Sequence, residues 1–179
     1  MTAIEILCNE HQLIVEALNL LERHLRELDA GRPFNPEFAR WMIEFLREFA
    51  DDTHHAKEEG VLFGLLEQRG LTPSTGPLAA MLADHARCRT LAEDMDRALL
   101  RGDAVEFAAR GRQLAELLRR HVARENETLF GMAAGLLTPD EDAKAVQAFG
   151  RVVREREGVL VRQRHLAAME RWRKVLVAA

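Results

Sequence analysis

The sequence contains one short pattern twice, and the pattern joins candidate metal ligands to an apolar tail. Residues 54–64 read HHAKEEGVLFG and residues 121–131 read HVARENETLFG, so both stretches contain His-x-x-x-Glu-x-x-x-Leu-Phe-Gly. Residues four apart lie on one face of an α-helix, so each histidine would share a face with its glutamate. Imidazole and carboxylate together are ligands that first-row transition metals accept, iron in particular.

Four histidines interrupt the apolar faces of four predicted helices: His11, His54, His85 and His121. Each stands about 16 to 18 residues from a predicted helix end, or roughly 25 Å along the helix axis at 1.5 Å per residue. If consecutive helices alternate in direction, the four imidazoles meet at one level. Glu58 and Glu125 then lie one turn further along the same inward faces.

Such a cluster places two carboxylates in an apolar interior, where an unpaired carboxylate is costly. Metal ions would remove this cost, and two carboxylates with two oxygens each could bridge two ions. The alternatives are that each histidine is an ordinary core residue or that the bundle is structural and metal-free. Four histidines at one level, two of them followed by glutamate, favour the metal site.

Four long helices are predicted to hold these residues. Apolar residues recur at spacings of three and four along nearly the whole chain. Turn signals at 29–33, 70–77 and 101–103 separate the helices. The short connections favour an all-α fold, an up-down-up-down four-helix bundle over residues 1–137. Thr138-Pro139 begins a fifth helix, broken near Gly158, and residues 138–179 are expected to pack on the same domain as a C-terminal extension.

The composition argues against several other classes of protein. A net charge of −4 gives no electrostatic reason to expect nucleic acid or an anionic membrane as a partner. No apolar run approaches the roughly 20 residues of a membrane span, and the N-terminus lacks a signal-peptide pattern. Two cysteines are too few for a disulfide framework, so we expect a cytoplasmic protein. The absence of tyrosine excludes a tyrosyl radical.

The ordered motifs resemble those of the hemerythrin-like, or HHE cation-binding, family. The likeness covers residues 11–131 and rests on Glu10-His11, HHAKEEGVLF, MLADHARCR and HVARENETLF. It implies a non-haem site of two iron ions with an oxo or hydroxo bridge and two bridging carboxylates. Ferritin-like proteins use Glu-x-x-His instead, with the opposite order. Carried over position by position, the implied ligands are His11, His54, Glu58, His85, His121 and Glu125.

The sequence departs from the oxygen-carrying hemerythrins at position 89. Those proteins have a second histidine one turn after the ligand of the third helix, and this chain has Arg89. Four histidines would ligate two irons evenly and leave each an open position, which disfavours simple oxygen storage. The resemblance therefore implies binding of, or reaction with, O2, peroxide or nitric oxide under oxidative or nitrosative stress. The alternative is a sensor of iron or oxygen, or an iron storage or delivery module, which would act without turnover through a homodimer or a separate protein partner.

Residues beside the six receive more ordinary predictions. On an α-helix His55 points about 100° away from His54, so we expect it at the surface or behind a ligand. Pairing His55 with Glu59 is rejected because the second repeat aligns His121 with His54. Glu59 is expected behind a ligand or in solvent, and Cys88 in the core.

The remaining polar residues near these motifs are expected mostly in solvent. Arg89 is predicted to be a surface charge, or else to bind an anion or a bridging glutamate. Glu10 and Asp84 each precede a ligand histidine and face away from its ring, so they are predicted in solvent unless they reach an imidazole of a neighbouring helix. His24 and His165 are predicted to be exposed.

Overall fold

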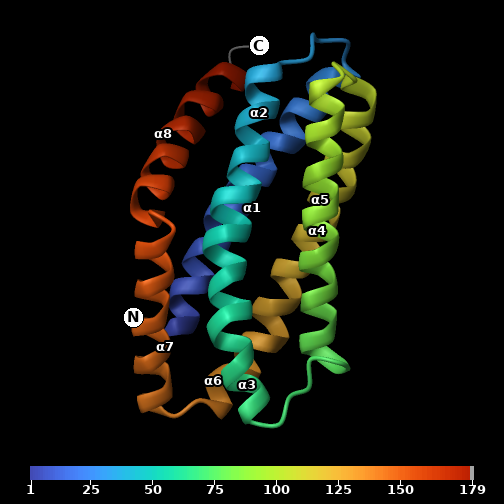
Figure 1. Cartoon of the computed structure of the whole chain (residues 1–179). Helices are drawn as coiled ribbons and strands as arrows, with labels where there is room; N and C mark the ends of the chain where they lie inside the picture. Colours follow the sequence, from blue (N-terminus) through green and yellow to red (C-terminus); the bar gives the residue numbers. More distant parts are fainter. Residues whose placement is uncertain (178–179) are drawn as a thin grey trace.

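The computed structural model describes residues 1–177, and within them the chain forms helices and loops and no strand. In chain order the helical segments, with η denoting a π-helical stretch, are α1 (Ala3–Asp29), α2 (Pro36–Phe45), η1 (Leu46–His55), η2 (Glu58–Leu62), α3 (Phe63–Gln68), α4 (Gly76–Leu100), α5 (Ala104–Arg124), η3 (Glu125–Leu129), α6 (Phe130–Leu136), α7 (Pro139–Glu155) and α8 (Gly158–Val177). No loop separates α2 from α3 or α5 from α6, so these segments form two continuous rods (Figure 1). Together with α1 and α4 they make a helical bundle, which confirms the all-α prediction. None of the helices in residues 1–177 combines the length and the apolar character that a membrane span requires.

Capping contacts explain where the helices begin. The side-chain oxygens of Asn35 and Asp103 accept hydrogen bonds from backbone N–H groups of the turn that follows each residue. Thr138 forms a reciprocal capping box at the start of α7. The predicted break near Gly158 is confirmed, because α8 begins there after a two-residue interruption that separates it from α7.

Both rods change to π-helical hydrogen bonding at the repeated motif. η2 begins at Glu58 and η3 begins at Glu125, and each stretch ends at the leucine before Phe-Gly. η1 extends the same bonding over ten residues up to His55. A hydrogen bond from residue i+5 to residue i widens the turn, so each residue advances by less than the roughly 100° of an α-helix. Neighbours such as His54 and His55 therefore point in more similar directions than in an α-helix.

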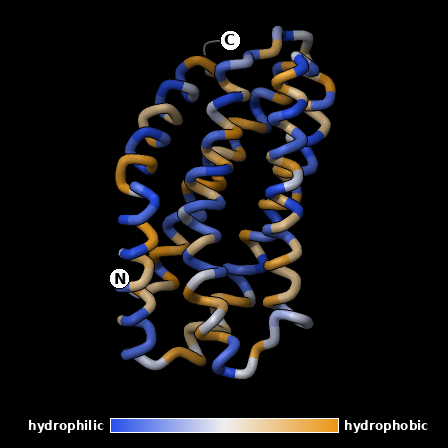
Figure 2. The backbone as a smooth tube through the Cα atoms, viewed as in Figure 1, coloured by the Kyte–Doolittle hydropathy of each residue, from blue (hydrophilic) through white to orange (hydrophobic). Residues whose placement is uncertain are grey.

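Two apolar clusters fill the bundle. In α1, one cluster contains Leu7 and the other begins at Ile14; in α4, the same two clusters contain Met81 and Cys88. His11, His54 and His85 fall between the two clusters along their helices, and His121 lies at the end of the cluster that contains Ile14, beside Val122. Along the backbone, hydrophobic and hydrophilic residues alternate in short stretches (Figure 2), as amphipathic helices require. The polar site is thus a layer between two apolar regions.

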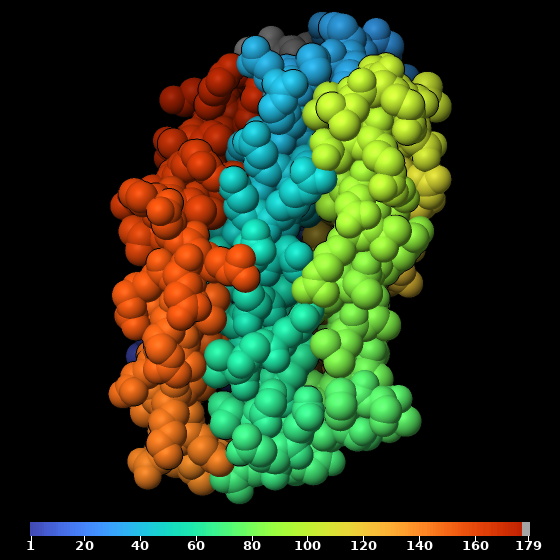
Figure 3. All heavy atoms as spheres, viewed as in Figure 1, coloured from blue at the N-terminus to red at the C-terminus, as the bar shows by residue number. Residues whose placement is uncertain are grey.

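The helices α7 and α8 cover one side of the bundle. The α8 helix contacts α1, α2 and η1, whereas α7 contacts α1 and η2. Figure 3 shows their side chains packed beside the rod that runs from α2 to α3. The rings of Trp41 and Trp172 lie 6.4 Å apart between centroids, and both side chains belong to the larger apolar cluster.

Two histidines that were expected in solvent are buried instead. The ring of His24 packs 4.6 Å from that of Phe38, and burial lowers the pKa of His24 to about 4. His165 is also buried, and its Nε2 lies 2.8 Å from a carboxylate oxygen of Glu48. The prediction was wrong because the spacing of residues on one helix does not show which of its flanks another helix will cover.

Candidate metal centre

The structure brings together all six side chains that the repeated motifs and their partners suggested. They come from α1, η1, η2, α4, α5 and η3, and each is at most 2% exposed: His11, His54, Glu58, His85, His121 and Glu125. The predicted level of the four imidazoles is therefore reproduced. Together with His55, which was not among them, the six side chains form two groups that could each hold a metal ion. In each group the ligand atoms all lie within 4.8 Å of one another: His11, His54, Glu58 and Glu125 in one, and His55, Glu58, His85 and His121 in the other.

Glu58 lies between the two groups. Its Oε1 lies 3.4 Å from His54 Nε2, and its Oε2 lies 3.4 Å from His85 Nε2. Two ligand atoms that are each about 2.1 Å from one ion lie roughly 3.0 to 3.4 Å apart at angles of about 90° to 110°. The two oxygens of Glu58 therefore suit ions on opposite sides of one carboxylate.

Glu125 has a similar position. Its Oε2 lies 3.1 Å from His11 Nε2 and 3.1 Å from His121 Nε2, so it also faces both groups. The Nε2 atoms of His85 and His121 are 3.2 Å apart. These separations match those of atoms that share an ion, and the residues present thus fit a dinuclear metal centre.

The outward nitrogen of each imidazole meets an oxygen from another helical segment. His11 Nδ1 lies 2.8 Å from Asn126 Oδ1, and His54 Nδ1 lies 3.1 Å from Glu10 Oε2. Because these oxygens accept hydrogen bonds, Nδ1 carries the proton and Nε2 remains free to face the centre.

The second half of the chain repeats these contacts. His85 Nδ1 lies 2.7 Å from Glu59 Oε1, whereas His121 Nδ1 lies 3.4 Å from Asp84 Oδ2, an ion-pair contact that forms no hydrogen bond. Contacts of this kind hold a metal-binding imidazole in one tautomer and one orientation. The predicted place of Glu59 behind a ligand is confirmed.

The expectation that Glu10 and Asp84 are solvated is wrong. Each carboxylate faces an imidazole of a neighbouring helix, which was the less favoured alternative, and each also pairs with a basic residue. Lys57, which is 1% exposed, pairs with Glu10, and Arg124 pairs with Asp84. The sequence signal for these basic residues was their alignment, since Lys57 and Arg124 occupy the same place in the two motifs.

Several inward-facing atoms have no hydrogen-bond partner within the described part of the chain. They are His11 Nε2, His54 Nε2, His55 Nε2 and both carboxylate oxygens of Glu58 and of Glu125. Buried polar atoms are normally hydrogen-bonded, because an unsatisfied group costs about 1 to 3 kcal/mol, and more if charged. A set of such atoms that all face one point is expected where a cation binds.

Burial and neighbouring charges shift the pKa values of these groups in different directions. Burial lowers the pKa of His54 well below its usual value. Burial alone would also lower the pKa of His121, but Asp84 and Glu125 outweigh it and raise the pKa to about 10. Burial alone would raise the pKa of Glu125, but His11 and His121 hold it far below its usual range. Glu125 is therefore an anion among imidazoles, and a metal ion bound there would replace protons.

His55 does not lie at the surface. It is 2% exposed, its ring stacks on that of His85 with centroids 3.8 Å apart, and it belongs to the second ligand group. The surface prediction assumed an α-helical turn, whereas His55 ends the π-helical stretch η1. Its Nδ1 lies 3.2 Å from Asp51 Oδ1.

Arg89 is a charge with a side chain 40% exposed, as the surface prediction had it, but it also pairs with two carboxylates that the prediction did not name. It donates to both oxygens of Asp51, at 2.8 and 3.0 Å, and to Glu59 Oε1 at 2.7 Å. Burial alone would raise the pKa of Asp51, but hydrogen bonds from His55 and Arg89 hold it well below its usual range. The guanidinium thus holds two carboxylates, one behind His55 and one behind His85.

Cys88 lies in the core, as predicted. Burial raises the pKa of its thiol to about 12, so the thiol stays protonated at neutral pH. Both cysteines are free. The buried, protonated thiol of Cys88 is not suited to a redox switch.

The fold is a helical bundle, and its interior contains buried histidines and glutamates that could hold metal ions. These features place the chain in the class of helical cation-binding proteins. A family model described as the hemerythrin HHE cation binding domain matches residues 2–133, a span that includes every residue of the two ligand groups. The chain belongs to this family. The curated proteins and the solved structures compared with it include no match.

Proposed function

We propose that this chain binds two iron ions through His11, His54, Glu58, His85, His121 and Glu125, and that the pair binds or reacts with O2, peroxide or nitric oxide. The observation that carries the proposal is the position of Glu58, whose two oxygens each lie 3.4 Å from a histidine of a different group. Glu125 Oε2 supports it, because this one oxygen lies 3.1 Å from both His11 and His121. We take residues 1–137 as an up-down-up-down four-helix bundle and residues 138–179 as its extension. A bound iron pair would supply a change of redox state and polarise a small ligand.

The protein's own residues have three roles in this proposal. The Nε2 atoms and the two carboxylates bind the ions, while the oxygens of Asn126, Glu10, Glu59 and Asp84 orient the imidazoles. The apolar clusters on both sides exclude bulk water from the centre. The chain thereby restricts the site to small ligands.

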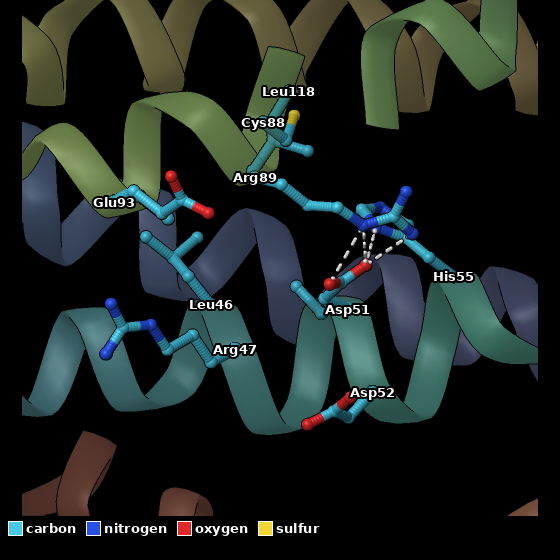
Figure 4. A pocket seen from close by; sticks show the side chains of 11 residues that line it. Leu46, Arg47, Asp51, Asp52, His55, Cys88, Arg89, Glu93 and Leu118 are labelled. Atoms are coloured by element: carbon cyan, nitrogen blue, oxygen red, sulfur yellow. Dashed lines mark hydrogen bonds and ion pairs between the residues drawn. The ribbon is translucent and has the colours of Figure 1, made fainter. Parts of the chain in front are cut away.

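A pocket beside the centre offers such ligands a route. Its volume is about 280 Å³, and it is lined by residues of η1 and α4 that include Asp51, His55, Cys88, Arg89 and Ala92. Figure 4 shows the contacts of Asp51 with both Arg89 and His55 in this pocket. His55 also belongs to a ligand group, so the pocket reaches the polar layer.

Narrowing this pocket is expected to slow ligand entry without removing metal. Ala92→Leu adds volume to the wall, and we expect the rate at which nitric oxide changes the optical spectrum of the iron-loaded protein to fall several-fold. Iron content should stay at the wild-type value, as measured by elemental analysis. Ala167→Leu, on the exposed side of α8, is the matched control. An unchanged rate in Ala92→Leu would exclude this pocket as the route.

Metal removal tests the proposal directly. We expect purified protein to contain two iron ions per chain. A ligand present at 100 times its dissociation constant stabilises the folded state by about 2.7 kcal/mol, so bound metal should raise the stability by about this amount. For a chain of this size, that corresponds to roughly 5 to 10 °C in Tm. Elemental analysis for iron, manganese and zinc gives the content, and calorimetry with and without a chelator gives the shift. A chain that binds none of these metals, with the same Tm in both samples, would refute the proposal.

A sensor without turnover is the second candidate function, and the unsatisfied buried groups favour it. Because these groups are paired only when metal binds, metal would compact the bundle, and a second copy or a separate protein could respond to the change. An iron storage or delivery module would use the same binding. Catalytic consumption of peroxide or nitric oxide by the iron-loaded protein supports the reactive function, whereas metal-dependent compaction without consumption supports the sensor.

A further inference from the structure

The contacts around the centre repeat in the two halves of the chain. In each half the acidic residue before one histidine, Glu10 or Asp84, faces the motif histidine of the next rod, and a basic residue of that motif pairs with the acid. In each half, the residue after the motif glutamate faces the first histidine of the other half: Glu59 faces His85, and Asn126 faces His11. The outer contacts are therefore related by an approximate twofold repeat.

Three polar residues break this repeat together. His55 corresponds to Val122, Asp51 corresponds to Leu118, and Arg89 corresponds to Val15. Asp51 links the other two, because its carboxylate accepts hydrogen bonds from both His55 and Arg89. One half of the centre thus contains a histidine with its own supporting carboxylate and arginine, and the other half has apolar side chains there.

The geometry of His55 matches that of the other inward-facing histidines. Its Nδ1 is held by a carboxylate, and its Nε2 is buried without a hydrogen-bond partner in residues 1–177. Its ring stacks on His85, and its ligand atom lies within 4.8 Å of those of Glu58, His85 and His121. The Nε2 of His24 is also buried without a partner, so the missing partner alone does not identify a ligand. The position of His55 among the ligand atoms of Glu58, His85 and His121 distinguishes it from His24.

We infer that His55 is a seventh protein ligand and that the two ions are bound unequally, one by His11 and His54 and the other by His55, His85 and His121. Asp51 and Arg89 are positioning residues: Asp51 orients the His55 ring, and Arg89 holds Asp51 and Glu59 together. This inference rests on the proposed metal centre. It replaces the expectation of an even division among four histidines.

The test compares His55→Val, which installs the residue of the equivalent position in the other half, with wild type. We expect stepwise iron titration to show affinity for one of the two ions at least about 10 to 100 times weaker, since even loss of an outer partner costs that much. We expect the Mössbauer spectrum of the wild type to show two different iron sites, and the signal of one to be lost or changed in His55→Val. His55→Gln keeps a polar side chain and should show the same loss.

His165→Val is the matched control, because it removes another buried histidine that contacts a carboxylate, and neither residue belongs to a ligand group. It should keep both ions at wild-type affinity, and circular dichroism with thermal unfolding of metal-free samples shows which variants fold. If folded His55→Val and His55→Gln bind both ions with unchanged affinity and spectra, the inference is wrong and the metal centre stands. If wild type itself binds no metal, the proposed function fails instead.

Discussion

Glu58→Gln is expected to release both metal ions. The substitution keeps the shape of the side chain but removes the anionic oxygens that face both ligand groups, at 3.4 Å from His54 and 3.4 Å from His85. Because Glu58 contacts both groups, its loss should lower the affinity for both ions. The loss of affinity should exceed the roughly 10 to 100-fold that loss of an outer partner costs. Elemental analysis and iron titration of the purified variant measure this loss.

Without metal, the same substitution is expected to stabilise the fold or leave its stability unchanged. Glu58 is 0% exposed and neither carboxylate oxygen has a hydrogen-bond partner in the described chain, so it destabilises the metal-free fold. A neutral amide costs less to bury, so metal-free Glu58→Gln should be at least as stable as metal-free wild type in urea unfolding. Glu59→Gln is the control: among the histidines Glu59 contacts the outer nitrogen of His85, and it also pairs with Arg89, so its substitution should weaken metal binding less. Two ions retained at full affinity in Glu58→Gln would contradict a bridging role.

Lys57→Met is expected to destabilise the protein by about 3 to 5 kcal/mol, the usual cost of removing one partner of a buried ion pair. Lys57 is 1% exposed and pairs with Glu10, which in turn faces His54. Without the ammonium, Glu10 would be left largely buried without a positive partner, and burial already raises the pKa of Glu10 above its usual value. For a chain of this size we expect Tm to fall by roughly 6 to 20 °C, as measured by calorimetry.

The sequence repeat supplies the control for this prediction. Arg124 occupies the place of Lys57 in the second motif and pairs with Asp84, but its side chain is 48% exposed. Arg124→Met should therefore cost no more than about 1 kcal/mol, as exposed ion pairs do. Glu10→Gln added to Lys57→Met should recover part of the loss, because it removes the unpaired charge. Similar losses for the two single variants would show that burial of Lys57 does not decide its contribution.

Most of the inner residues could be predicted because they depend on spacing along helices. A histidine and a glutamate four residues apart share a face in any regular helix, and the turn signals set the helix lengths that bring His11, His54, His85 and His121 to one level. The helix start at Thr138-Pro139 is a local signal of the same kind. These predictions need only the geometry of one helix and its ends.

The predictions that were wrong depend on how helices contact one another. Glu10 and Asp84 were expected in solvent because they face away from the histidines beside them, yet their side chains reach the imidazoles of adjacent rods. His24 and His165 were expected in solvent because nothing in their own helices showed which flank would be covered. Contacts between helices depend on axial rotation and rotamers, which residue spacing does not define.

The sequence by itself determined that the chain is all-helical, that two His-x-x-x-Glu motifs recur with the same tail, and that six ligand-type side chains converge in an apolar interior, because helical periodicity and turn chemistry are local properties. Only the tertiary structure decided that η1 turns His55 inward and that Asp51 and Arg89 support it on one side of the centre alone. The physical reason is that π-helical hydrogen bonding differs from α-helical bonding by a small free energy, so the packing of the surrounding helices, and not the local sequence, selects it.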